Sequence, residues 1–171
     1  EHRTPIDYLR MLAASHRALV IHGNYLLPAE WGFLREQKER MSLIYCPRTQ
    51  AYFQHGRYPL TEILAAGVHV AIGTDSRASN PDLSLWKELQ LIAEIYPEIS
   101  PTKILELGTV NGAIALGDGE GRGTIAPGGI AELITIPIGN SPLESIWGID
   151  AMPDGLVLPS GQKGCDFWQF N

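Results

Sequence analysis

The stretch GVHVAIGTDS, residues 67–76, decides the expected fold. An apolar run from Val68 to Ile72 leads directly into a polar loop that contains Asp75. In parallel α/β folds, chemistry is done at the carboxyl ends of the strands. Asp75 is therefore a candidate catalytic carboxylate, and the alternative is that it caps the helix that follows.

Two similar apolar segments precede this stretch. Residues 18–21 (ALVI) end at His22, and residues 42–46 (SLIYC) end at Pro47. Helical patterns precede, separate and follow the three segments, at residues 6–17, 29–41, 60–66 and 83–96. This alternation predicts βαβ units and a parallel sheet. Since all three strands read as apolar on both faces, we expect helices to cover the sheet on both sides.

The later part of the chain differs in composition and in predicted secondary structure. A helix is predicted over residues 100–116, opened by Ser100 or Thr102, and a glycine-rich segment follows it. Residues 130–136 read as a strand, and the remainder is rich in Pro and Gly. We therefore predict two parts, an α/β domain over residues 1–122 and a small β appendage over residues 123–171.

Composition excludes several classes of partner. The chain has 171 residues, 13 of them Lys or Arg, and a net charge of -6, which argues against nucleic acid. No apolar run approaches the length of a membrane span. Cys46 and Cys165 form neither a zinc cluster nor a redox pair, so a reducing, cytoplasmic location is expected. The first residue is Glu1, and we expect the chain to be part of a longer protein.

His22 and Asp75 are the leading candidates for chemistry. Each ends a predicted strand, so parallel pairing places both at one edge of the sheet. Imidazole nitrogen and carboxylate oxygen are ligands that zinc and iron take, although a single histidine can also be structural. Arg48, after the second strand, either contacts a substrate or braces its loop. His55, in the same loop, is either a site residue or an exposed surface histidine.

Three motifs in order, LVIHGNYL (19–26), YCPRT (45–49) and GTDSRASN (73–80), resemble the second half of amidohydrolase-superfamily enzymes. The branch is that of the cytosine, guanine, adenosylhomocysteine and aminofutalosine deaminases and the triazine chlorohydrolases. The resemblance covers roughly residues 5–135. It implies the C-terminal half of a (β/α)8 TIM barrel, strands 5–8, followed by a β-sandwich-like segment over residues 123–171.

The resemblance also implies roles for residues. His22 would be the metal ligand on the fifth strand, and Asp75 the ligand on the eighth strand that also carries the proton of the metal-activated water. Tyr25 and Arg48 would line the substrate pocket. His55 would take the electrophilic role that many relatives give to a histidine on the sixth strand.

This sequence departs from the family pattern in several places. No two histidines are two residues apart, so the His-x-His pair of the first strand is absent. Tyr45 stands where many members have a histidine before Cys-Pro, and Gln50 stands where aminofutalosine-type relatives have another. Tyr25 occupies the place of the usual general-acid glutamate. Ser79 and Asn80, which the resemblance makes loop-shaping residues, are retained.

These observations predict a metal-dependent hydrolase of C–N bonds in a cyclic amidine or nucleobase-like small molecule, a deaminase with one divalent metal, zinc or iron. The isolated 171-residue chain is expected to be inactive and to bind metal weakly. Exposed sheet edges favour homo-oligomers. The alternative is a non-catalytic, degenerate half-barrel used for binding or assembly.

Overall fold

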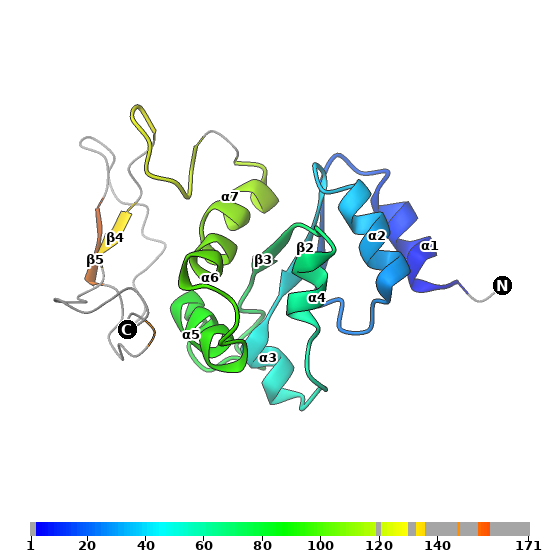
Figure 1. Ribbon diagram of the computed structural model, residues 1–171, viewed down its shortest axis with the longest axis horizontal. Coiled ribbons are helices and arrows are strands. Elements are labelled where there is room, and N and C mark those ends of the chain that lie inside the picture. The colour runs from blue at the N-terminus through cyan, green and yellow to red at the C-terminus, as the bar shows by residue number, and fades with distance from the viewer. Residues whose placement is uncertain (1–2, 119–120, 130–132, 136–146, 148–153, 158–171) are drawn as a thin grey trace.

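The structure, a computed structural model, describes residues 3–118, 121–129, 133–135, 147 and 154–157. Helices and strands alternate through most of this part (Figure 1). The elements are α1 (Pro5–Leu12), β1 (Ala18–Ile21), α2 (Pro28–Glu36), β2 (Met41–Tyr45), α3 (Pro47–Tyr52), α4 (Leu60–Ala65), β3 (Val70–Ile72), α5 (Leu85–Ile95), α6 (Pro101–Gly108), α7 (Val110–Leu116), β4 (Leu133–Thr135) and β5 (Asp154–Val157).

The first three strands form a parallel sheet in the order β1-β2-β3. Ile21 pairs with Ile44, and Tyr45 pairs with Ile72, so the three strands end nearly level with one another. The sequence-based prediction of an α/β fold with a parallel sheet is confirmed. The residues that follow the strands therefore share one edge of the sheet, and the candidate site is built there.

One face of the sheet carries the main core. Leu43 and Tyr45 of β2 and Val70 of β3 are buried there among side chains from the surrounding helices. On the opposite face, Ile44, Cys46 and Ala71 pack with Ala115 of α7 in a smaller cluster. Both faces of the two strands are therefore covered, as their sequences predict.

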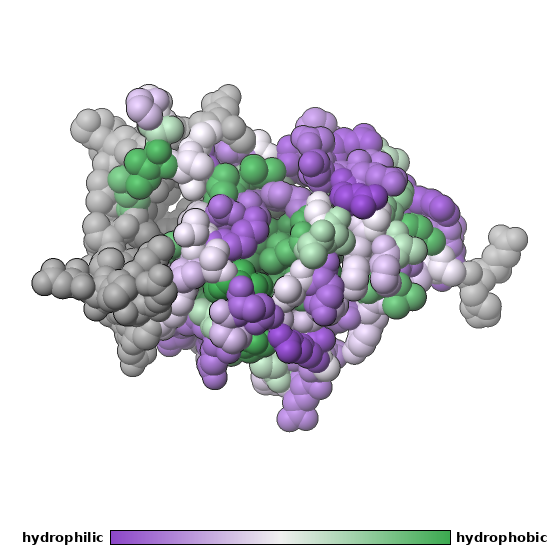
Figure 2. Space-filling view, in the orientation of Figure 1, coloured by the Kyte–Doolittle hydropathy of each residue, from purple (hydrophilic) through white to green (hydrophobic). Residues whose placement is uncertain are grey.

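Strand β1 differs from this expectation. Leu19 and Ile21 keep 38% and 48% of their surface exposed, although both are apolar. β1 lies at the edge of the sheet, and these side chains point to the face on which the smaller cluster lies, beyond its reach. The prediction that helices cover all three strands on both faces is thus right for β2 and β3 and wrong for β1 in the described part of the chain. Elsewhere, Figure 2 shows apolar side chains reaching the surface between hydrophilic ones.

Two local differences separate the structure from the predicted elements. The helix expected over residues 100–116 is two helices, α6 and α7, because Thr109 leaves the helical region with φ -121 and ψ -95. The segment after β2, predicted to be a loop, begins a short helix, α3. Pro47 occupies the first turn of this helix, where the fixed φ of proline is favourable.

The strand expected over residues 130–136 is described at Leu133–Thr135 and pairs antiparallel with β5. The division of the chain at residues 122 and 123 stays a prediction. No helix among the described residues has the length and apolar character needed to cross a membrane.

The core predicts a clear stability effect. Leu43 is fully buried in the middle of β2. Leu43→Ala should lower the unfolding free energy by about 2–5 kcal/mol, because the substitution leaves a cavity. Leu116→Ala is the matched control, since Leu116 is 75% exposed and its loss should change stability by less than about 0.5 kcal/mol. Urea denaturation measures both, and equal effects would contradict this assignment of the core.

Candidate functional site

The structure brings His22 and Asp75 together at the carboxyl edge of the sheet. His22 Nε2 lies 3.7 Å from Asp75 Oδ2, and the side chains are 36% and 29% exposed. Nitrogen and oxygen ligands of one tetrahedral zinc ion lie about 3.3 Å apart, given bonds of about 2.0–2.1 Å. The two donors thus fit a shared metal ion in chemistry and spacing, and they remain open to solvent.

Both residues adopt an uncommon backbone conformation. His22 has φ 66 and Asp75 has φ 56, in the left-handed region that side chains other than glycine seldom occupy. The backbone N–H of His22 still donates to the carbonyl of Ile44, and the hydroxyl of Tyr58 donates to the carbonyl of His22. Such strained residues persist when their surroundings fix them, and they concentrate at functional sites. His22 directly follows β1, and Asp75 lies in the loop three residues after β3.

Hydroxyl groups hold the carboxylate of Asp75. Ser79 Oγ donates to Asp75 Oδ2 over 3.0 Å, and Thr49 Oγ1 lies 2.9 Å from Ser79 Oγ. Thr49 and Ser79 are both buried, one in α3 and the other in the loop after β3. The sequence reading missed Thr49; its signal was a hydroxyl residue just beyond the end of a predicted strand.

Beneath this loop lies a buried carboxylate, Glu88, which the sequence reading also missed. Its oxygens accept hydrogen bonds from Asn80 Nδ2 and from the backbone N–H of Arg48. Burial raises the pKa of Glu88 to about 7, while the two hydrogen bonds and the Arg48 guanidinium act in the opposite direction. Its position in the sequence could have indicated its burial, because Glu88 lies on the apolar face of α5, one turn after Leu85 and four residues before Ile92.

Arg48 acts as a brace in this structure. Its guanidinium pairs with the carboxylate of Asp82, which also accepts from Lys87 Nζ over 2.9 Å. These cations hold the pKa of Asp82 far below its usual range, the Arg48 hydrogen bond being the largest cause. Of the two interpretations of Arg48 from the sequence, bracing of the loop matches this ion pair, and a contact with a substrate stays a prediction.

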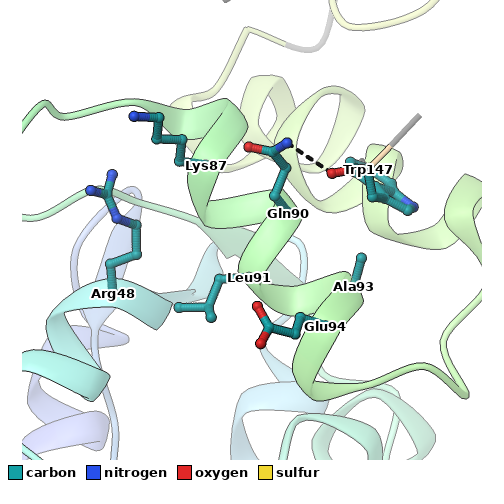
Figure 3. A pocket seen from close by; sticks show the side chains of 7 residues that line it. All are labelled: Arg48, Lys87, Gln90, Leu91, Ala93, Glu94 and Trp147. Carbon is teal, nitrogen blue, oxygen red and sulfur yellow. Dashed lines mark hydrogen bonds between the residues drawn. The ribbon is translucent and has the colours of Figure 1, made fainter. Parts of the chain in front are cut away.

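Arg48 also borders a cavity of about 590 Å³ on the outer side of α5 (Figure 3). Lys87, Gln90 and Trp147 contribute to its lining, and Gln90 Nε2 donates to the Trp147 carbonyl over 2.8 Å. Neither His22 nor Asp75 lines this cavity. It is therefore separate from the candidate site.

Tyr25 and His55, predicted to serve substrate binding and the electrophilic role, meet each other. The Tyr25 hydroxyl lies 2.8 Å from His55 Nδ1, and the rings are nearly perpendicular, with centroids 5.7 Å apart. Gln50 steadies the loop by donating to the carbonyl of Gly56. The loops after β1 and after α3 are joined by this pair, and Tyr25 presents most of its surface to solvent.

Tyr45 lies away from the site. It is buried in the main core and stacks on Tyr58 with centroids 4.1 Å apart. Burial raises the pKa of its hydroxyl well above the ordinary value. Because side chains alternate along a strand, Tyr45 faces the main core, while Cys46 faces the smaller cluster on the opposite face of the sheet. Tyr45 therefore does not replace the histidine that many relatives carry at this place.

Within the described residues, no group of three or more His, Cys, Asp and Glu side chains could hold a metal ion. A catalytic zinc site takes three protein ligands and a water molecule. His22 and Asp75 therefore fit part of such a site, and further donors would have to come from elsewhere in the protein.

The amidohydrolase family model matches residues 1–154. The chain belongs to the amidohydrolase family. It is 36% identical over 125 residues to a 5-methylthioadenosine/S-adenosylhomocysteine deaminase of Moorella thermoacetica, which covers 69% of this chain and 29% of that protein. It is 37% identical over 129 residues to a probable guanine deaminase of Deinococcus radiodurans, covering 71% and 28%.

A solved structure supports the same relationship. An adenosine deaminase from Xanthomonas campestris with bound zinc matches with a TM-score of 0.72 and 26% identity, covering 82% of this chain and 34% of that one. This amidohydrolase chain spans about three tenths of the length of the two curated relatives. The family resemblance predicted from the three sequence motifs is confirmed.

Glu88 predicts a pH dependence of stability. Its folded pKa of about 7 exceeds the ordinary value of 4.5, so the folded protein binds this proton more tightly than the unfolded chain does. The unfolding free energy should therefore fall as pH rises from about 4.5 to 7. The charges that act on Glu88 are those of Arg48, which lowers its pKa, and Asp82, which raises it. Glu88→Gln should flatten the curve in this window, as measured by denaturation at several pH values.

Glu36→Gln is the matched control, because it makes the same chemical change on an exposed side chain of α2. It should shift stability by less than about 0.5 kcal/mol at any pH in the window. An unaltered pH slope in Glu88→Gln would contradict the assignment.

Proposed function

We propose that His22 and Asp75 are two ligands of one divalent metal ion, most simply zinc, in a hydrolase that cleaves C–N bonds of a cyclic amidine or nucleobase-like substrate. The reaction would be deamination. The observation that carries the proposal is the His22–Asp75 pair, 3.7 Å apart at the carboxyl edge of parallel strands in an amidohydrolase-family chain. The matching architecture would be the C-terminal half of a TIM barrel, strands 5–8, in residues 1–122. The described residues supply three strands of it, in the order β1-β2-β3.

The relatives support this choice of chemistry. The two curated proteins are named as deaminases of a purine nucleoside derivative and of guanine. The adenosine deaminase with a similar fold holds zinc. Each acts on an amino group attached to a purine ring carbon, so a ring with an exocyclic amine is the substrate class proposed for the whole protein.

The chain's own residues would move the proton. When bound, a divalent metal makes water a strong nucleophile at neutral pH. The Asp75 carboxylate then accepts a proton from the attacking water and delivers it to the departing nitrogen. The other proton of the water ends on the neighbouring ring nitrogen. The C–N bond breaks, ammonia leaves and the ring carbon becomes a carbonyl. Ser79, with Thr49 behind it, keeps Asp75 Oδ2 in place for this transfer.

Tyr25 and His55 would contact the substrate. Their hydrogen bond joins two loops, so each ring limits the movement of the other. We assign them to substrate binding, with His55 available to polarise a ring atom by donating or accepting a hydrogen bond. Tyr25 provides an exposed aromatic surface for stacking on a heterocycle.

Replacement of Asp75 tests the proposal. In the full-length protein, Asp75→Asn should reduce kcat about 10²–10⁴-fold, because the proton acceptor is lost. Bound zinc per chain should fall as well. Ammonia release from S-adenosylhomocysteine, 5-methylthioadenosine, adenosine and guanine, together with elemental analysis, measures both effects.

His22→Gln should also lower zinc content, with His16→Gln as its control on an exposed histidine. Asp118→Asn is the control for Asp75, since Asp118 is a surface residue paired with Arg122. A full-length protein without bound metal and without deaminase activity would favour the non-catalytic binding module instead.

Tyr25→Phe isolates the Tyr25–His55 hydrogen bond. A neutral hydrogen bond contributes about 0.5–1.5 kcal/mol, so KM should rise about 2–10-fold while kcat changes little. Tyr52→Phe is the control, because Tyr52 is also an exposed tyrosine near this loop. A change in kcat alone would instead place Tyr25 in the proton-transfer step.

A further inference from the structure

Glu88 is fully buried, yet it is an acidic side chain in the first turn of α5. An isolated charge in the protein interior is strongly unfavourable, so a buried carboxylate requires hydrogen-bonding partners. Glu88 has partners from two other segments of the chain. These are the start of α3 and the loop that follows β3.

The first connection leads to the backbone of Asp75. Glu88 Oε1 accepts from Asn80 Nδ2 over 2.6 Å, and the same amide donates to the Thr74 carbonyl over 2.9 Å. Asn80 Oδ1 accepts from the backbone N–H of Leu83 over 3.1 Å. Both the nitrogen and the oxygen of the Asn80 side-chain amide are therefore hydrogen-bonded, and the amide binds the carbonyl of the peptide that directly precedes Asp75.

The second connection leads to the side chain of Asp75. Glu88 Oε2 accepts from the backbone N–H of Arg48 over 2.8 Å, which fixes the first turn of α3. The next residue, Thr49, contacts Ser79, and Ser79 donates to Asp75 Oδ2. The side chains of Glu88, Thr49 and Ser79 along this path are buried, and the Asp75 carboxylate at its end is partly exposed.

We propose that Glu88 is a positioning residue for Asp75, fixing its strained backbone through Asn80 and its carboxylate through the start of α3. This inference rests on the proposed function, since it concerns the alignment of the proposed proton carrier. Asp75 has φ 56, a conformation that needs restraint from its surroundings. The loop from Thr74 to Asn80 receives that restraint from one buried carboxylate.

A carboxylate is required because both oxygens act as acceptors. Gln has nearly the same shape but only one acceptor oxygen, and its amide nitrogen is a donor. In Glu88→Gln, that nitrogen must face either the Asn80 amide or the Arg48 N–H, so one connection is lost. The variant therefore breaks the network without creating a cavity.

The test uses Glu88→Gln in the full-length protein. We expect kcat to fall about 10-fold with KM within about 2-fold, and zinc affinity in chelator competition to fall about 10-fold, as is usual for residues that orient metal ligands. Amide hydrogen exchange should become faster in residues 74–83. Asn80→Ala, which removes the bonds of Asn80 to Glu88, Thr74 and Leu83 but keeps the Glu88–Arg48 connection, should accelerate exchange in the same segment.

Ile63→Val is the control for a general loss of stability, since Ile63 is fully buried in α4 outside this network. It should lower the melting temperature while kcat, zinc affinity and exchange in residues 74–83 stay near wild type. Should Glu88→Gln fail to fold, Asn80→Ala is judged by the same three measurements.

The inference would be overturned if Glu88→Gln had wild-type kcat, zinc affinity and exchange. It would also be overturned if Glu88→Gln and Ile63→Val had the same melting temperature and lost kcat and zinc affinity to the same extent. A wild-type protein without zinc or activity would overturn the proposed function separately. Hydrogen exchange alone then decides whether Glu88 restrains the loop.

Discussion

The parallel register of β1, β2 and β3 is the constraint on which the candidate site depends. Because the strands run in one direction and end nearly level, His22 and Asp75 leave the sheet at the same edge although more than fifty residues separate them. Any shift of one residue between strands would exchange the two faces of the sheet and turn these side chains away from each other. The core packing of β2 therefore also sets the geometry of the site.

Two kinds of interaction then refine what the sheet provides. The backbone is left-handed at His22, directly after β1, and at Asp75, in the loop after β3. Buried polar side chains, Glu88 among them, restrain the loop that carries Asp75. A network of this kind stabilises the protein only when every member is satisfied, and the Glu88 oxygens each have a donor. The same low-dielectric surroundings that raise the Glu88 pKa also strengthen these hydrogen bonds.

Family membership and the His22–Asp75 geometry support the proposed metal-dependent hydrolysis. This chain would contribute two ligands, and a catalytic zinc ion takes three from the protein. The two curated relatives are about three and a half times as long as the matched region. The exposed Leu19 and Ile21 lie on β1, the strand directly before His22, so the uncovered face of β1 adjoins the candidate site.

The sequence by itself determined the parallel α/β fold, the three strands and the positions of His22 and Asp75, because apolar runs that end in polar residues mark strand ends locally. It also pointed to the family through three ordered motifs. Tertiary structure decided that Tyr45 faces the core, that Arg48 braces a loop and that Glu88 lies beneath Asp75. These outcomes depend on contacts between residues distant in sequence, such as Arg48 and Glu88, which no local pattern specifies. The break at Thr109 has the same origin, since helix propensity is weak compared with packing.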